Sequence, residues 1–352
     1  MPARSPARLT PAEAADALRS PRVAEDLVAE GDETAVVVEG DWSAVPSAAE
    51  PAWFDALREI PTVTVAVAGS PLGPTGGLLA AGFDVLLVED GVPAPDGAAP
   101  ADALSGLLES VADRPLAALV LVQLLRAGAG GNAGLLAESL GYGLLQSGPE
   151  FAAWLASHER EPPPPSGPPM QVERAGDCLE VVLDRPAVRN ALDTEMRDAL
   201  VEVFTAAAAD PTVASIVWRG EGPAFCSGGA LWEFGTVPDP PTGHLVRSTR
   251  LPARAVARCS ARLRARVHGA CVGAGVELPA FAARVEAEPD TTFRLPEVAM
   301  GLVPGAGGTV SLPRRIGRHR TAFMGLTGQA VDAETALSWG LVDELLSGAA
   351  SG

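Results

Sequence analysis

Hydrophobic runs alternate with amphipathic segments along the first quarter of the chain, and this alternation predicts a layered fold of strands and helices. The apolar runs at 34–40 and 61–69 are rich in β-branched residues and are typical of buried strands. Segments 10–30 and 51–60 read as helices, and residues 73–91 as a turn, a short helix and a further strand. Strands that alternate with helices favour a parallel sheet.

A helical block is expected at 101–158, where apolar positions recur at spacings of three and four residues. Such helices need another part of the protein on which to bury their apolar faces. The proline-rich segment that follows favours an extended spacer with little potential for helix or sheet. We therefore expect one unit at 1–160, a linker at 161–169 and a second unit at 170–352.

The second unit repeats the alternation of strands and helices, so the whole chain is expected to be an α/β protein. Its predicted strands are 178–186, 215–220 and 284–288. Its predicted helices are 191–210 and a region within 245–263.

The stretch RARVHGACVGAGVEL, residues 264–278, combines a buried strand at 266–268 with a glycine-rich turn at 269–275 and a helix start carrying Glu277. Glycines let a backbone pass close to a ligand because they carry no Cβ. Amides at the entry to a helix can donate to a developing negative charge, and a nearby carboxyl can act as a general acid or base. The pattern also fits a packed turn in which Glu277 is a solvated helix residue.

Composition and charge narrow the class of protein. With 352 residues and 47% hydrophobic content, the chain can bury one large core or two modest ones. The net charge of −18 argues against a nucleic-acid partner, and most of it lies in residues 1–160, which hold 22 acidic and 8 basic side chains. No apolar run predicts a membrane span or a signal peptide. The four cysteines lack metal-ligand spacing, so we expect a reduced, cytoplasmic setting and no metal.

Five segments stand in a characteristic order: LDRPAVRNALDTEM (183–196), GPAFCSGGAL (222–231), the stretch at 264–278, FRLPEVAMGLVPGAGGTVSLPRRIG (293–317) and GLVDEL (340–345). In order and spacing they resemble the enoyl-CoA hydratase/isomerase (crotonase) superfamily, over about residues 170–346. The resemblance implies a spiral of β-β-α units and an acyl-CoA thioester substrate. It also implies no cofactor beyond the coenzyme A of that substrate, and a homo-oligomer, either a trimer or a hexamer.

The same resemblance suggests four catalytic residues. The backbone amides of Gly229 and Ala274 correspond to the oxyanion hole, which polarises the thioester carbonyl without any side-chain ionisation. Glu277 and Glu297 correspond to the family's two catalytic acids. We expect Glu297 to protonate Cα and Glu277 to help hold the water, so hydration of a 2-enoyl-CoA, or the reverse dehydration, is the leading reaction.

Coenzyme A contacts are also implied by the resemblance, at two facing segments of the chain. The expected residues are Ala187, Val188, Arg189, Ser227, Ala230 and Leu231. At position 230 the family often has aspartate, so Ala230 is a departure. Seven arginines between 247 and 266 could meet the phosphates of coenzyme A. Such a run is more often a solvated face or a surface between subunits, and none of the seven is assigned to the site.

A weak internal repeat relates the two units, because residues 64–82 align with 264–282 at an offset of 200 and without a gap. Pro74 and Gly77 then replace Ala274 and Glu277, so the first copy lacks both an amide donor and the acid. We interpret the N-terminal unit as a degenerate crotonase-like half. Its helical block at 101–158 is expected to supply the helices with which that family usually continues after the last motif.

Two alternatives to hydration remain open at this point. One is another oxyanion-hole reaction on an acyl-CoA: isomerisation, thioester hydrolysis, decarboxylation or a cofactor-free oxygenation. The other is a non-catalytic subunit that binds acyl-CoA or an active paralogue. The presence of both Glu277 and Glu297 counts against the second alternative, whereas Ala230 counts for it.

Overall fold

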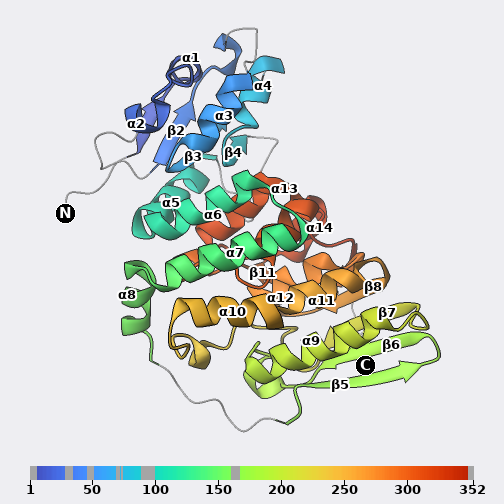
Figure 1. The fold of residues 1–352 in the computed structure, drawn as a ribbon. Helices are drawn as coiled ribbons and strands as arrows, with labels where there is room; N and C mark the ends of the chain where they lie inside the picture. The colour runs from blue at the N-terminus through green and yellow to red at the C-terminus, as the bar shows by residue number, and fades with distance from the viewer. Residues whose placement is uncertain are drawn as a thin grey trace.

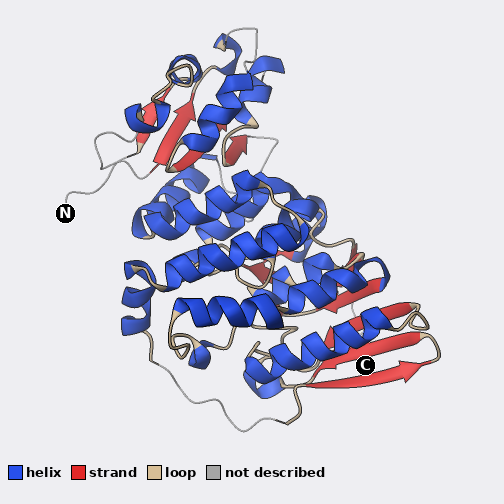
Figure 2. Ribbon diagram, viewed as in Figure 1, coloured by secondary structure: helices blue, strands red, loops and turns tan. Residues whose placement is uncertain are grey.

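The chain is stacked in three parts, with a small N-terminal α/β unit at one end, a helical layer in the middle and a larger α/β unit at the other end (Figure 1). This computed structural model describes residues 6–27, 35–45, 51–68, 72, 74–88, 100–159 and 167–347. Figure 2 shows that the helical layer separates the strands of the two α/β units. The predicted α/β class is confirmed. Most of the linker predicted at 161–169 lies outside the described residues, and the division into units at 1–160 and 170–352 stays a prediction.

The N-terminal unit is a four-stranded parallel sheet in the order β1-β2-β3-β4. Its strands are β1 (Ala7–Leu9), β2 (Ala35–Glu39), β3 (Val63–Ala68) and β4 (Val85–Val88). Its helices are α1 (Pro11–Ala17), α2 (Val23–Asp26), α3 (Pro51–Glu59) and α4 (Pro74–Ala80). The strands predicted at 34–40 and 61–69 are thus confirmed, and β1 is an addition. The helix expected at 10–30 is divided in two, because Pro21 lies between α1 and α2 and has no N–H for a helical bond.

The helical layer confirms the block predicted at 101–158. It contains α5 (Pro100–Asp113), α6 (Pro115–Ala127), α7 (Gly131–Gln146) and α8 (Pro149–Ser157). These helices pack on the larger unit at positions where glycine allows close approach. A Cβ on Gly134 would lie 2.7 Å from Val310, and one on Gly325 would lie 2.7 Å from Leu121. The layer therefore shares one hydrophobic core with the larger unit.

The larger unit is built on a six-stranded sheet in the order β13-β10-β8-β7-β6-β5, in which the β5–β6 pair is antiparallel and the other pairs are parallel. Its strands are β5 (Met170–Ala175), β6 (Cys178–Leu183), β7 (Ser215–Gly220), β8 (Leu263–Val267), β10 (Arg284–Ala287) and β13 (Glu344–Leu345). A second sheet has the order β12-β11-β9. Its strands are β9 (Ala270–Val272), β11 (Thr292–Arg294) and β12 (Val331–Asp332).

Twice the chain passes from the large sheet to the small sheet and then into a helix, as β8-β9-α12 and as β10-β11-α13. This succession matches the predicted spiral of β-β-α units. The helices of the unit are α9 (Thr194–Ala209), α10 (Pro240–Arg250), α11 (Pro252–Cys259), α12 (Ala274–Glu277), α13 (Gly308–Thr327) and α14 (Ala333–Trp339). The helical region expected within 245–263 is two helices, because Pro252 starts a new one.

The turn predicted at 269–275 is wrong in part. Three of its residues form β9, which pairs in parallel with β11. The sequence offered too short an apolar run to separate a three-residue strand from a turn. Glycines still flank this strand, since Gly269 and Gly273 have φ values of 55° and 50°.

The repeat predicted between the two units has a counterpart in strand order and register. Val65 of β3 pairs with Val85 of β4, and Ala265 of β8 pairs with Val285 of β10, so both pairs keep the offset of 200. α4 and α12 follow β3 and β8 at the same offset. The aligned positions 69 and 73 lie outside the described residues. That the N-terminal unit is a degenerate crotonase-like half stays a prediction.

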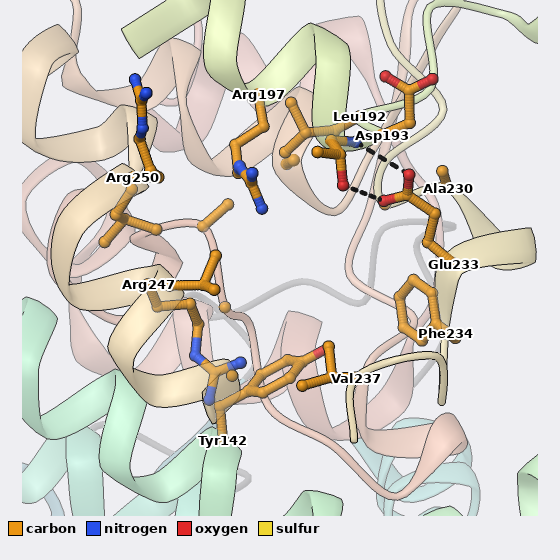
Figure 3. Close-up of a pocket in the computed structure, with 18 of the residues that line it drawn as sticks. Tyr142, Leu192, Asp193, Arg197, Ala230, Glu233, Phe234, Val237, Arg247 and Arg250 are labelled. Carbon is orange, nitrogen blue, oxygen red and sulfur yellow. Dashed lines mark hydrogen bonds between the residues drawn. The ribbon is translucent and has the colours of Figure 1, made fainter. Parts of the chain in front are cut away.

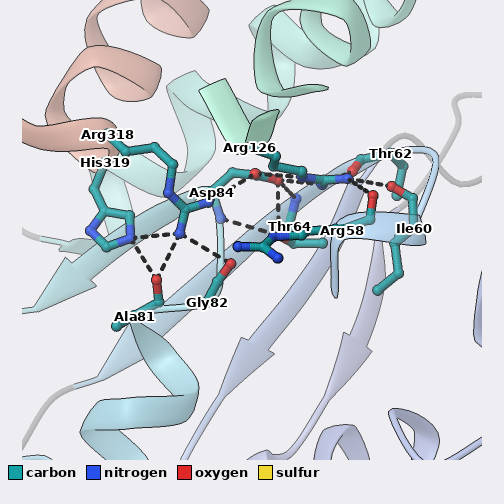
Figure 4. A network of polar contacts seen from close by, with 10 residues as sticks. All are labelled: Arg58, Ile60, Thr62, Thr64, Ala81, Gly82, Asp84, Arg126, Arg318 and His319. Atoms are coloured by element: carbon teal, nitrogen blue, oxygen red, sulfur yellow. Dashed lines mark hydrogen bonds and ion pairs between the residues drawn. The ribbon is translucent and has the colours of Figure 1, made fainter. Parts of the chain in front are cut away.

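A buried ion pair fixes the N-terminal sheet to the helical layer (Figure 4). Asp84, 1% exposed, accepts hydrogen bonds from Nε and a terminal nitrogen of Arg126 at 2.8 and 2.6 Å. The N–H and hydroxyl of Thr64 also donate to Asp84. Arg318 of α13 donates to the carbonyl of Ala81, at 2.7 Å, next to this pair. The network therefore joins all three parts of the chain.

Asp84→Asn should lower the free energy of unfolding by about 3 kcal/mol or more, because it leaves the buried Arg126 without its counter-charge. Denaturant titration followed by circular dichroism measures this loss. Asp55→Asn is the matched control, since Asp55 pairs with Arg58 on the exposed face of α3. An equal loss in the two variants would contradict the structural role given to Asp84.

Candidate functional site

A pocket lies between the helical layer and the larger unit, and it gathers side chains that are far apart in sequence (Figure 3). α7 contributes Tyr142 and Gln146 to its wall, and α10 contributes Arg247 and Arg250. All four predicted catalytic residues also line it: Gly229, Ala274, Glu277 and Glu297. The structure therefore brings the predicted catalytic residues to one cavity.

The two predicted amide donors lie in neighbouring loops. Leu192 and Gly229 form an isolated β-bridge. In this bridge the N–H of Leu192 donates to the carbonyl of Gly228, and the carbonyl of Leu192 accepts from the N–H of Ala230, so the N–H of Gly229 is not used. Ala274 is the first residue of α12, where a helix leaves its amides without internal acceptors. Within the described part of the chain, neither N–H has a hydrogen-bond acceptor. Both are thus available to a ligand oxygen in the pocket.

Close backbone approach keeps these two loops together. Gly228 has φ of 89°, and a Cβ on it would lie 2.8 Å from the carbonyl oxygen of Val272. A Cβ on Gly273, with φ of 50°, would lie 2.5 Å from Oε1 of Glu297. These two positions require glycine both for their conformation and for the space beside them.

Glu277 is 2% exposed, so the alternative that makes it a solvated helix residue is wrong. Its Oε2 accepts hydrogen bonds from the N–H groups of Ala306 and Gly308 at 2.7 and 2.8 Å. Burial, followed by the nearby carboxyls of Glu297 and Glu138, raises the pKa of Glu277 well above its usual value. The backbone bonds hold one oxygen in place and act in the opposite direction on the pKa.

Glu297 lines the same pocket with the second of the two predicted catalytic carboxyls. Its Oε2 is buried and has no hydrogen-bond partner among the described residues. Burial raises its pKa to about 7, and the neighbouring Glu138 adds to the rise, whereas the backbone N–H of Glu297 itself and the charge of Arg294 lower it. A carboxyl that changes protonation near neutrality can exchange a proton with a bound substrate.

The predicted coenzyme A residues fall into two groups. Ala230 lines the pocket, whereas Ala187, Val188, Arg189, Ser227 and Leu231 are not among its lining residues. The two segments do lie together, since Ser227 N–H donates to the carbonyl of Arg189 at 3.0 Å. Ala187, Arg189 and Leu231 are exposed, so a ligand that leaves the pocket can reach them.

The sequence did not indicate the residues that α7 and α10 bring to the pocket. The guanidinium of Arg247 stacks on the ring of Tyr142, 4.6 Å from its centroid, and donates to Ser139 and Gln146 of α7. Its place in the pocket wall corrects the expectation that all the arginines between 247 and 266 serve a solvated or intersubunit face. Gly305 leaves room for Tyr142, because a Cβ there would lie 2.7 Å from the ring.

Glu297→Gln should stabilise the protein in a pH-dependent way. A carboxyl with a folded pKa of about 7 binds its proton more tightly in the folded state than in the unfolded state. The free energy by which this carboxyl destabilises the folded state is therefore small near pH 4.5. It grows as the pH rises to about 7 and is constant above that pH. We expect the variant to gain on the order of 2–3 kcal/mol at pH 8 and little near pH 4.5.

Denaturant titrations at the two pH values measure this gain. Glu288→Gln, the same substitution at an exposed position, is the control. A gain that is equal at both pH values would mean that Glu297 does not carry a raised pKa.

The amino-acid sequence of the chain was compared with those of known protein families and proteins. The family model described as enoyl-CoA hydratase/isomerase matches residues 173–350. The 2,3-dehydroadipyl-CoA hydratase of Escherichia coli (strain K12) is 36% identical over 176 residues, which cover 49% of this chain and 68% of that protein. A probable mitochondrial enoyl-CoA hydratase 2 of Arabidopsis thaliana is 34% identical over 47% of this chain and 55% of its own length.

Solved structures also show similarity to this chain. The enoyl-CoA hydratase of Mycobacterium smegmatis is 32% identical, with a TM-score of 0.48, over 51% of this chain and 71% of that one. All of these matches concern about half of this chain. The chain belongs to the enoyl-CoA hydratase/isomerase family.

No helix in the described ranges has the length and apolar character needed to cross a membrane.

Proposed function

We propose that the protein is an enoyl-CoA hydratase, which adds water to a 2-enoyl-CoA thioester or catalyses the reverse dehydration. The observation that carries the proposal is that Glu277 and Glu297 line one pocket together with the amides of Gly229 and Ala274. Hydration needs a donor and an acceptor of protons and a means of stabilising an enolate, and these four residues supply all three. The hydratases and dehydratases among its relatives support the same class of reaction.

In the proposed reaction, the thioester oxygen accepts hydrogen bonds from the N–H groups of Gly229 and Ala274. Each such donor is typically worth about 3 kcal/mol to the transition state, because it is aimed at the developing negative charge. Glu277, whose Oε2 is fixed by two backbone amides, holds the water and accepts a proton from it as the water oxygen attacks Cβ. Glu297, whose Oε2 has no other partner in the described chain, delivers the proton to Cα.

Coenzyme A would leave the pocket past Ala230 toward the exposed residues Ala187, Arg189 and Leu231. Val188 and Ser227 lie where the two segments that carry these residues meet. The reaction as proposed needs no cofactor beyond the coenzyme A of the substrate. We further propose that the protein acts in the cytoplasm as a homo-oligomer, a trimer or a hexamer. Size-exclusion chromatography with light scattering would measure the subunit number, and a monomer would contradict the last point.

The proposal is tested by following the ultraviolet absorbance of the conjugated enoyl thioester with the purified full-length protein. Crotonyl-CoA and several aromatic and dicarboxylic enoyl-CoAs should be compared, since the acyl group is not specified by the four residues. Saturable loss of the enoyl absorbance with at least one substrate is expected. Binding of these esters without turnover would contradict the proposal and favour the non-catalytic alternative.

A further inference from the structure

A third buried carboxylate lies beside the two predicted catalytic acids, and it comes from the helical layer. Glu138 is 1% exposed on α7. Its Oε1 accepts from the N–H of Gly307 at 2.7 Å, and its Oε2 accepts from the N–H and the hydroxyl of Thr309 at 2.9 and 2.7 Å. Glu138 is also the one charged residue of α7, whose other residues are uncharged.

These bonds alternate with those made by Glu277. Along the backbone that leads into α13, Ala306 and Gly308 donate to Glu277, whereas Gly307 and Thr309 donate to Glu138. The four consecutive amides are therefore shared between two carboxylates, one on α7 and one on α12. The segment also lies at the N-terminus of α13, where the helix dipole favours negative charge.

The geometry points to Glu138 as a positioning residue for the catalytic carboxyl of Glu277. By holding Gly307 and Thr309, Glu138 fixes the orientation of the peptide groups between them, so that Ala306 and Gly308 direct their N–H groups at Glu277. The inference rests on the proposed function for the role of Glu277, but its structural part concerns the 306–309 segment alone. The site would then depend on contacts between two distant parts of the chain.

Charge acts in addition to geometry. Glu138 acts electrostatically on the carboxyls of Glu277 and Glu297, and the guanidinium of Arg247 acts on Glu138. Burial raises the pKa of Glu138 to about 7, while its bonds to Thr309 and Gly307 oppose that rise. Its negative charge raises the pKa of both Glu277 and Glu297. Removing this charge should therefore lower the pKa of the two catalytic carboxyls.

The first test is amide hydrogen exchange in the full-length protein, comparing wild type with Glu138→Gln. Glutamine cannot accept at both of its terminal atoms, so we expect exchange at 306–309 to become about tenfold faster. The decisive amides are Ala306 and Gly308, which Glu138 does not touch. Unchanged protection at these two amides would overturn the inference.

Glu150→Gln is the matched control. Glu150 of α8 also binds two backbone amides, those of Leu116 and Ala117 at 2.8 and 3.0 Å, and it does not line the pocket. This variant should leave exchange at 306–309 unchanged. If Glu138→Gln does not fold, Thr309→Val is the second variant, because it removes the hydroxyl bond to Glu138 and keeps the negative charge. Hydrogen exchange at Ala306 and Gly308 should then become faster, but by less than in Glu138→Gln. Exchange at the wild-type rate would again overturn the inference.

A second readout separates positioning from simple packing. The acidic limb of the pH–rate profile should move to lower pH in Glu138→Gln and return toward the wild-type position in Glu138→Asp, which restores the charge. A profile that stays in place while the rate falls would reduce Glu138 to a packing role. Wild type without hydratase activity would defeat the proposed function, whereas the exchange result would still decide the positioning role.

Discussion

Glu297→Gln is expected to reduce the turnover number for enoyl-CoA hydration by about a thousandfold, with little change in KM. Glutamine keeps the size and polarity of the side chain, but it has no proton to deliver to Cα. General acid–base catalysis by a positioned group typically contributes about 10²–10⁴-fold, and the proposed reaction has no second group at this position. Steady-state kinetics on the best enoyl-CoA substrate measures the effect.

Glu233→Gln is the control for that loss. Glu233 also lines the pocket, but its two oxygens accept hydrogen bonds from the N–H and hydroxyl of Thr194. Figure 3 shows two hydrogen bonds at the Glu233 carboxylate. We expect this variant to keep most of its activity. Turnover above one-tenth of the wild-type value in Glu297→Gln would exclude Glu297 as the acid.

Removal of the N-terminal part should abolish the fold of the larger unit. A fragment of residues 160–352 lacks α5–α8 and so loses the buried side chains Leu121, Leu125 and Leu135 from the shared core. It also exposes the amides of Gly307 and Thr309 that Glu138 now satisfies. Burying a large apolar side chain is worth about 1.5–3 kcal/mol, so these three alone approach the whole stability of a typical domain, about 5–15 kcal/mol.

Circular dichroism and cooperative unfolding measure the outcome for this fragment. The expected result is an aggregated or non-cooperative fragment without hydratase activity, and recovery of both properties when residues 1–159 are co-expressed. A fragment that folds cooperatively, assembles and turns over substrate would contradict the role given to the helical layer.

The sequence predicted the elements whose hydrophobic pattern is local. β2, β3 and β7 are runs of β-branched and apolar residues, and their limits were close to those observed. The short strands β1 and β9 were missed, because three residues carry too little pattern to distinguish a strand from a turn. Such strands depend on a partner that lies elsewhere in the chain.

The candidate site was predictable where it follows family motifs and not where it depends on packing between distant segments. Glu277 and Glu297 were identified from the motifs that contain them, and both line the pocket. Glu138 and Tyr142 lie in the helical block at 101–158, which was predicted to supply helices to the second unit. That prediction did not identify which of its side chains would enter the site, because this depends on how the block packs on distant segments.

The reaction itself is tested most directly by incubating the wild-type protein with an enoyl-CoA in water enriched in ¹⁸O and analysing the products by mass spectrometry. Hydration predicts an intact acyl-CoA that has gained one labelled oxygen at Cβ, together with almost no label in the product of Glu297→Gln. Label in a free carboxylic acid would show thioester hydrolysis instead. An acyl-CoA of unchanged mass, with its double bond moved or in place, would contradict the hydratase account.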